Sequence, residues 1–448
     1  MPLIGTRGAV SANALGLFSA GGSNWLSTYS TPQLNRTNTI ACDANGNLYA
    51  GGLDNIGFNT FIQISKINPF GTLLWQKNIT TSPTYNIFTN APAISCDING
   101  NIYCFGTIKD PSTSIEFLYI SKYDTNGVFL WGRTLQVFSV NVTLNDLKIA
   151  IDSAFNVIVV GSVYDGVNGS NIQIVKYNSS GVLQWQKQLL SPSGFAQDYG
   201  RGVTTDASNN VYITGSIDSL STPLVAKYNS SGVLQWQKYQ STVLTSTVMT
   251  DIGSDGTDVY ILGGSTVMTG PVYIFKYSNS GTLLWQRQLQ VNQTVQDSGQ
   301  ITVTGSGDVY YCCGEGLGAS PAPAIVAKYN SSGVLQWQRS IGVTDPSERT
   351  SGTGAAIDSK GALLVQLFGS SGVGAGAIMA RLPSNGTKTG TYALSSYNVA
   401  YTATTFTESA TSFTSSTLSA TDTTTTWVDA AFTPTVTNSS LSYVITQI

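Results

Sequence analysis

The chain has 448 residues, of which 10% are charged and 41% are hydrophobic, and its formal net charge is −3. Such a composition provides no basic field that would attract nucleic acid, so we expect no nucleic-acid partner. Histidine is absent, which excludes serine–histidine catalytic triads and zinc sites that contain histidine. No apolar run approaches the roughly 18 residues of a membrane span.

Residues 1–24, MPLIGTRGAVSANALGLFSAGGSN, precede the repeated part of the chain. A secretion signal needs an unbroken apolar core, whereas this stretch is interrupted by Ser11, Asn13 and Gly16. We therefore expect a short N-terminal arm that docks onto a larger assembly. A cleaved secretion signal is the alternative.

A repeat of roughly 50 residues organises the chain from Trp25 to Leu394. In six copies a lysine is followed five residues later by a glycine and nine residues later by a tryptophan. The lysines are Lys66, Lys122, Lys176, Lys227, Lys276 and Lys328, and the tryptophans are Trp75, Trp131, Trp185, Trp236, Trp285 and Trp337. Arg381 and Gly386 continue the pattern into a seventh copy that lacks its tryptophan, while Trp25 is in phase but has no strands before it. We therefore expect the Trp25 strand to complete the seventh copy and close a ring.

Each copy reads as four short strands joined by turns. The copy that begins at Gly202 contains the strands GVTTD, VYITGS, LVAKYN and VLQWQKY, with Asp/Asn and Asn/Ser turns between the members of each hairpin. Four β segments per repeat are typical of a propeller blade. The predicted fold is all-β: a seven-bladed β-propeller with four-stranded blades over residues 25–394, a short N-terminal arm, and a small C-terminal β-rich extension.

TDASNNVYITGS followed by PLVAKYNSSGVLQWQ resembles the bacterial seven-bladed β-propeller repeat family. AKYNSSGVLQW is also similar to the tryptophan-docking motif of quinoprotein-type propellers. This resemblance covers about residues 25–394 and implies the fold, and it implies little about activity, because the family consists mostly of secreted or surface proteins without an assigned activity. Separately, the opening MPLIGTRGAVSANALGLF resembles the leader of structural proteins of tailed bacteriophages.

The repeated residues are interpreted as scaffold. The seven in-phase tryptophans, Trp25 included, should pack between neighbouring blades with their indole N–H groups bonded to carbonyl oxygens. We expect the five cysteines to be buried and to pack as small hydrophobic residues; they are Cys42, Cys96, Cys104, Cys312 and Cys313. Asp43-Ala-Asn-Gly-Asn47 and its copy at Asp97 look like Asx turns, because neither has the acidic residue at position twelve that an EF-hand-type calcium loop requires. We therefore predict no catalytic residues, no metal site and no cofactor.

Binding is expected in the variable loops, which differ between blades in length and composition. The loops after each tryptophan strand and before each lysine strand should emerge on one face of the disc. The candidate binding residues are the aromatic side chains of these loops, Tyr85, Phe88, Phe138, Tyr164, Phe195 and Tyr199. Ordinary surface variation is the alternative interpretation.

Residues 395–448 form a Thr/Ser-rich segment without lysine or arginine. Its alternation of threonine with apolar residues favours a small β module over a disordered stalk. The final strand, Leu441 to Ile448, should pair with this module or with a neighbouring subunit.

These patterns favour a non-enzymatic structural protein of a tailed-phage virion, most plausibly of the tail or fibre apparatus. Its partners would be other virion proteins, reached through the arm and the C-terminal segment, and a host-surface glycan or protein, reached through the loops. The alternative is a secreted or surface-anchored bacterial propeller that binds protein or glycan. An enzyme would need a convergent acid–base or cofactor cluster, and no such cluster is evident in the sequence.

Overall fold

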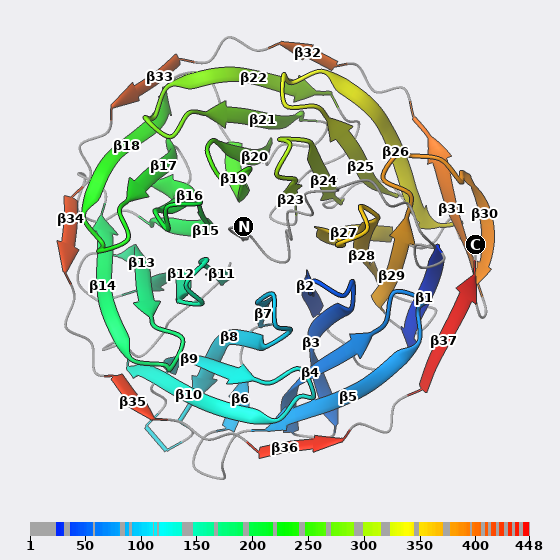
Figure 1. Ribbon diagram of the computed structural model, residues 1–448, viewed down its shortest axis with the longest axis horizontal. Coiled ribbons are helices and arrows are strands. Elements are labelled where there is room, and N and C mark those ends of the chain that lie inside the picture. Colours follow the sequence, from blue (N-terminus) through cyan, green and yellow to red (C-terminus); the bar gives the residue numbers. More distant parts are fainter. Residues whose placement is uncertain are drawn as a thin grey trace.

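The computed structural model is a closed ring of seven antiparallel β-sheets (Figure 1). The structure describes residues 24–30, 36–56, 59–80, 86–88, 92–110, 112–113, 116–136, 147–164, 169–190, 197–217, 222–241, 247–265, 270–290, 299–314, 323–344, 349–370, 377–394, 397–404, 408–410, 414–417, 421–424, 429–431, 435–438 and 442–447. All regular elements within these ranges are strands. The predicted all-β, seven-bladed propeller with four-stranded blades is confirmed.

Six blades take their strands, from the ring centre outward, from consecutive segments of the chain. Blade 1 contains β2 (Arg36–Cys42), β3 (Leu48–Ile56), β4 (Asn59–Ile67) and β5 (Leu73–Thr80). Blade 2 contains β7 (Ala93–Cys96), β8 (Ile102–Lys109), β9 (Glu116–Tyr123) and β10 (Phe129–Gln136), with β6 (Asn86–Phe88) also paired to β8. Blade 3 contains β11 (Lys148–Ile151), β12 (Val157–Tyr164), β13 (Ser170–Tyr177) and β14 (Leu183–Leu190). Blade 4 contains β15 (Tyr199–Thr205), β16 (Val211–Ile217), β17 (Thr222–Tyr228) and β18 (Leu234–Ser241). Blade 5 contains β19 (Thr247–Ser254), β20 (Val259–Ser265), β21 (Val272–Tyr277) and β22 (Leu283–Leu289). Blade 6 contains β23 (Gln300–Val303), β24 (Val309–Cys313), β25 (Ala324–Tyr329) and β26 (Leu335–Val343).

Blade 7 joins the two ends of the repeat array. It contains β27 (Arg349–Ile357), β28 (Leu363–Ser370), β29 (Ala377–Leu382) and, as its fourth strand, β1 (Trp25–Ser30). Trp25 lies opposite Arg381 in this pairing, just as Trp75 lies opposite Lys66 in blade 1. The N-terminal strand therefore occupies the place of the tryptophan strand that the seventh copy lacks.

The turn between the third and fourth strands requires glycine for two reasons. Gly232 has φ of +80°, which residues with a Cβ rarely adopt. A Cβ on Gly232 would also lie 2.7 Å from Cδ2 of Trp185 in the preceding blade. Each such glycine therefore shapes its own hairpin and allows the neighbouring tryptophan to approach.

The strands that the structure describes within residues 397–447 lie around the outside of the ring, and we call these strands the belt (Figure 1). It begins with β31 (Tyr397–Ala403) on blade 6, where β30 (Gly390–Leu394) pairs with β31 as a further strand. It continues with β32 (Glu408–Ala410) on blade 5, β33 (Thr414–Thr417) on blade 4, β34 (Thr421–Thr424) on blade 3, β35 (Asp429–Ala431) on blade 2 and β36 (Thr435–Asn438) on blade 1. The last strand, β37 (Ser442–Gln447), pairs with β1 in blade 7.

The belt thus runs around the ring against the order of the blades. Its strands are distributed over all seven sheets and do not make the separate small module suggested by composition. Most of them are only three or four residues long and could not bury a core of their own, whereas the outer strand of each blade offers a ready hydrogen-bonding edge.

The hydrophobic core lies between the stacked sheets. One buried cluster combines Tyr310 and Trp337 of blade 6 with Leu363 and Ile378 of blade 7, and equivalent clusters follow around the ring. Among the residues that the structure describes, there is no helix long and apolar enough to cross a bilayer.

Candidate functional site

At successive blade boundaries, a tryptophan and a lysine of one blade donate hydrogen bonds to the same backbone carbonyl oxygen of the next blade. Trp185 Nε1 donates to Ser230 O over 3.1 Å, and Lys176 Nζ donates to the same oxygen over 3.3 Å. The same arrangement places Trp75 with Lys66 on Thr125 O, Trp131 with Lys122 on Ser179 O, Trp236 with Lys227 on Asn279 O, and Trp285 with Lys276 on Ser331 O. Trp337 Nε1 donates to Ser384 O in blade 7. These tryptophans join blades.

The carboxylates of the turn aspartates also accept several hydrogen bonds from neighbouring side chains and backbone N–H groups. In blade 4, Asp206 Oδ2 accepts hydrogen bonds from Tyr212 Oη and Asn210 Nδ2, and the Lys227 ammonium lies 5.1 Å from the centre of the Tyr212 ring. Burial raises the pKa of the Tyr212 phenol and lowers the pKa of the Lys227 ammonium. The tyrosine therefore stays a neutral donor to the carboxylate.

Two blades lack this tyrosine, and in them the basic residue reaches the carboxylate directly. Lys176 lies opposite Ile158 in blade 3, and Arg381 lies opposite Leu364 in blade 7. Lys176 Nζ is 3.0 Å from Asp152 Oδ2, and Arg381 Nη2 is 2.7 Å from Asp358 Oδ2. In blade 4, Asp206 is bonded to Tyr212 and Lys227 Nζ also lies 4.0 Å from its Oδ2, whereas in blades 3 and 7 a shorter buried ion pair replaces the tyrosine contact.

Asp43 illustrates why these turns are poor metal ligands. Its Oδ1 accepts hydrogen bonds from the backbone N–H groups of Asn45 and Asn47, and its Oδ2 accepts them from Asn47 Nδ2 and Tyr49 Oη. Four donors already surround this one carboxylate. Within the described ranges, no three Cys, Asp or Glu side chains gather in a way that could hold a metal ion.

Sequence reasoning missed a pair of buried polar residues on the innermost strands. Thr39 Oγ1 accepts a hydrogen bond from Ile94 N over 2.8 Å, and Asp251 Oδ2 accepts one from Ile301 N over 3.2 Å. In both cases the side chain caps a backbone N–H of the next blade. These two residues could have been found in the sequence by their shared position, four residues before the turn aspartates Asp43 and Asp255.

Of the six loop aromatics, the structure describes the side chain of Tyr199 alone, so their role in binding stays a prediction. Tyr85, Phe138 and Phe195 lie outside the described residues, and Phe88 in β6 and Tyr164 in β12 are described only in their backbone. Tyr199 begins β15, where its hydroxyl donates to Gln197 Oε1 and the Arg201 guanidinium lies 5.3 Å from its ring centre.

The five cysteines are buried and free. Burial raises the pKa of Cys104 and that of Cys312 to about 12. Thiols protonated to this degree are poor nucleophiles at neutral pH. Cys104 instead packs within the core, 3.0 Å from Tyr119 Oη.

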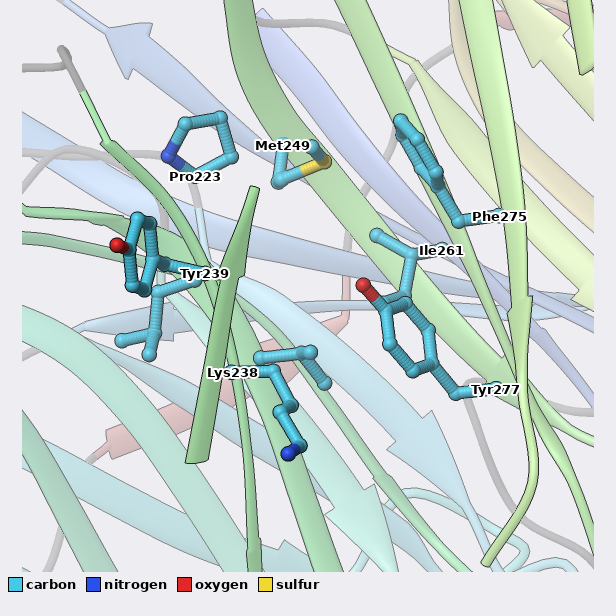
Figure 2. Close-up of a pocket in the computed structure, with 9 residues that line it drawn as sticks. Pro223, Lys238, Tyr239, Met249, Ile261, Phe275 and Tyr277 are labelled. Atoms are coloured by element: carbon cyan, nitrogen blue, oxygen red, sulfur yellow. The ribbon is translucent and has the colours of Figure 1, made fainter. Parts of the chain in front are cut away.

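A small pocket opens between blades 4 and 5 (Figure 2). Its lining is Pro223, Leu224, Val225, Lys238, Tyr239, Met249, Ile261, Phe275 and Tyr277. This lining is mostly apolar and contains no carboxylate or thiol, so it offers no acid–base pair and no nucleophile beyond one lysine and two phenols. The geometry is that of an imperfectly filled blade boundary.

Comparison with known proteins agrees with the ring geometry. Residues 184–220 match the family model for a beta-propeller repeat (SBBP). The chain is a β-propeller built from sequence repeats. The propeller is also 26% identical over 286 residues to an uncharacterized WD repeat-containing protein of Acanthamoeba polyphaga mimivirus, a match that covers 54% of this chain and 20% of the viral protein.

Two solved structures are similar to the propeller at low identity. An alpha-L-arabinanase of Penicillium chrysogenum, complexed with arabinobiose, is 10% identical with a TM-score of 0.48, covering 82% of this chain and 99% of the arabinanase. The beta-propeller domain of the Trilobed protease from Pyrococcus furiosus is 9% identical with a TM-score of 0.41, covering 78% of this chain and 94% of that domain.

Proposed function

We propose that this β-propeller is a non-enzymatic structural and binding protein of a tailed-phage virion, belonging to the tail or fibre apparatus. The observation that carries the scaffold part is the use of the repeated Trp, Lys and Asp side chains in contacts between and within blades. Residues held in this way stabilise a rigid disc and are not free to take part in acid–base chemistry. The absence of histidine from the sequence favours the same interpretation.

Two observations favour a virion. The N-terminal residues resemble the leader of tailed-phage structural proteins, and the matched WD repeat-containing protein belongs to a virus. A ring joined through β1 and surrounded by a belt also suits a particle that must survive outside a cell. Neighbouring virion proteins would contact residues 1–24 and the outer side of the belt, and a host-surface glycan or protein would bind the variable loops.

A secreted or surface-anchored bacterial propeller that binds protein or glycan is the second candidate, and the resemblance to the bacterial repeat family favours it. Both candidates predict binding without catalysis. They differ in where the mature protein resides and in its N-terminus.

Mass spectrometry of purified particles from the source culture separates the candidates. The virion proposal expects the protein in the particles with residues 1–24 intact, with or without the initiator Met1. Absence from the particles, together with cleavage near Ala20 in the cell-surface fraction, would reject the virion proposal and support the bacterial surface protein.

A further inference from the structure

Each belt strand pairs with its blade at the same register. In blade 3, Lys187 stands two residues after Trp185 and lies opposite Thr424. The residue two positions after the repeat tryptophan has such a belt partner in all seven blades. The pairs are Arg339 with Ala403, Arg287 with Ala410, Lys238 with Thr417, Lys187 with Thr424, Arg133 with Ala431, Lys77 with Asn438 and Ser27 with Ile445. Successive belt partners are therefore always seven residues apart.

The C-terminal sequence carries the same seven-residue period. Four places before each of these partners stands an apolar residue or proline: Val399, Phe406, Phe413, Ala420, Trp427, Pro434 and Leu441. The three acidic residues of this segment, Glu408, Asp422 and Asp429, each stand two places before a partner of Lys or Arg. In the register they are diagonal to that basic residue, a spacing at which opposite charges attract. The period by itself names no partner, and the registers supply it.

One heptad, the name we use for each seven-residue segment from 397–403 to 439–445, is enough chain to advance by one blade. Three or four residues separate successive belt strands. A connection of this length reaches at most about 18 Å when fully extended. Stacked sheets lie about 10 Å apart, so skipping a blade would take roughly 20 Å or more. The belt therefore cannot omit a blade, and its heptads count the blades.

The last heptad lies on the strand that closes the ring. The belt starts on blade 6 and ends on the neighbouring blade 7, so it completes one circuit (Figure 1). There β37 pairs with all six residues of β1, from Trp25 to Ser30, whereas the belt strands on blades 1 to 5 each make three or four pairs. The longest belt ladder is thus placed on the strand that joins its blade from the other end of the chain.

We infer that the seven outer strand edges form one circular docking surface on which the C-terminal segment is placed one heptad per blade. Placement follows the phase of the heptads, because the ladder consists of backbone groups and every outer strand offers the same edge. The seventh heptad clasps β1 between β29 and β37 and so holds the ring closed. The clasp reaches β1 only when each of the other six blades has taken one heptad.

Changing the segment by a whole heptad tests the count in the full chain. Thr437 lies opposite Asn78 of blade 1, so Thr437→Cys should cross-link with Asn78→Cys on oxidation. Deleting residues 418–424 removes one heptad and should move every later heptad back by one blade. Thr437→Cys should then cross-link with Thr134→Cys of blade 2, at the position that Ala430 otherwise faces, and no longer with Asn78→Cys. Non-reducing gels distinguish the two disulfides.

Duplicating residues 418–424 provides a second variant in case the deletion variant does not fold. The duplication should move Thr437→Cys forward to blade 7, where it should cross-link with Thr28→Cys at the position that Val444 otherwise faces. Deleting only residues 418–421 is the matched control, because a four-residue change leaves the later heptads out of phase. In this control, Thr437→Cys should cross-link with none of the three partners.

Hydrogen exchange of residues 25–30 tests the clasp. In the variant lacking 418–424, the last heptad lies on blade 1, so β1 keeps its ladder to β29 and loses its ladder to β37. The amides that β37 protects should then exchange at least about tenfold faster, while the amides of β16 in blade 4 stay protected. The duplication leaves a heptad on β1, so residues 25–30 should exchange as they do in the unchanged chain.

Retention of the cross-link between positions 78 and 437 after the deletion would overturn the count, because the segment would then recognise individual blades. Absence of the shifted cross-link from both the deletion and the duplication variant would do so as well. Unchanged exchange of residues 25–30 in the deletion variant would overturn the clasp. Disulfide-linked dimers would place the segment on a neighbouring copy and contradict docking within the chain. None of these readouts depends on whether the protein belongs to a virion.

Discussion

At the residue scale, the recurring spacing between lysine and tryptophan has a geometric meaning. The two residues lie opposite each other on paired strands, as Lys227 and Trp236 do, and both point their donors at Asn279 O of the next blade. The glycine of that next blade, Gly281, must lack a Cβ because one would lie 2.9 Å from Cδ2 of Trp236. The lysine and tryptophan of one blade and the glycine of the next therefore form one interblade contact, which recurs around the ring.

Replacing Trp236 with Ala should lower the free energy of unfolding by about 2–3 kcal/mol, somewhat less than the ~3–5 kcal/mol of a fully buried tryptophan, because Trp236 is only half-buried. The loss combines the indole hydrogen bond with the packing against Tyr277. Equilibrium urea unfolding measures it. Gln235→Ala, at the exposed neighbouring position, serves as the control, and equal losses from both variants would contradict the docking role.

At the scale of elements, the N-terminal and C-terminal strands meet in one sheet. β1 lies between β29 and β37, so blade 7 depends on strands from the start and the end of the described residues. The spacing between Trp25 and the later tryptophans predicted that β1 completes blade 7. Nothing in the sequence predicted that β37 would cover its other side, because Thr/Ser alternation indicates a strand and does not specify its partner.

Deleting residues 1–30 should lower the melting temperature substantially, because β29 and β37 would both lose their ladder to β1. Differential scanning calorimetry makes the measurement. Deleting residues 1–23 leaves β1 in place and should have a much smaller effect. An unchanged transition after the longer deletion would show that β1 does not close the ring.

The course of the belt can be tested with paired cysteines. Gln188 lies opposite Thr423 on blade 3, and Asn78 lies opposite Thr437 on blade 1. Cα atoms of antiparallel partners are about 4.5–5.5 Å apart, within reach of a disulfide. Each of these pairs should therefore cross-link on oxidation, as monitored by a mobility shift on non-reducing gels. The mixed pair Gln188→Cys with Thr437→Cys should not cross-link within one chain, and its efficient cross-linking would contradict the reversed order.

At the scale of the whole molecule, burial of polar and ionisable groups ties stability to pH. Cys104 and Cys312 have pKa values raised to about 12 by burial, against ~8.5 for a thiol in an unfolded chain. Burial also raises the pKa of Tyr401 to about 12. A raised folded-state pKa stabilises the protein below the unfolded pKa, and that contribution is lost as pH rises toward the folded value.

The free energy of unfolding should therefore decrease above about pH 8.5, by up to about 1.4 kcal/mol per pH unit for each such thiol. Urea titrations at pH 7 and pH 10 measure the change. Cys104→Ala and Cys312→Ala should each reduce the slope, whatever their effect at pH 7. A stability that stays constant between the two pH values would contradict protonated burial of these thiols.

The blades follow from local features of the sequence. Hairpin turns and strand alternation are local, and the lysine–glycine–tryptophan spacing recurs in phase, so blade number, strand number and the docking residues all follow from the order of the amino acids. Tertiary structure alone decided which edges pair over long distances and which repeated side chains are exposed. The belt strands can pair with every blade because each outer strand offers a similar edge. This pairing joins residues far apart in the chain, and neither spacing nor composition encodes such contacts.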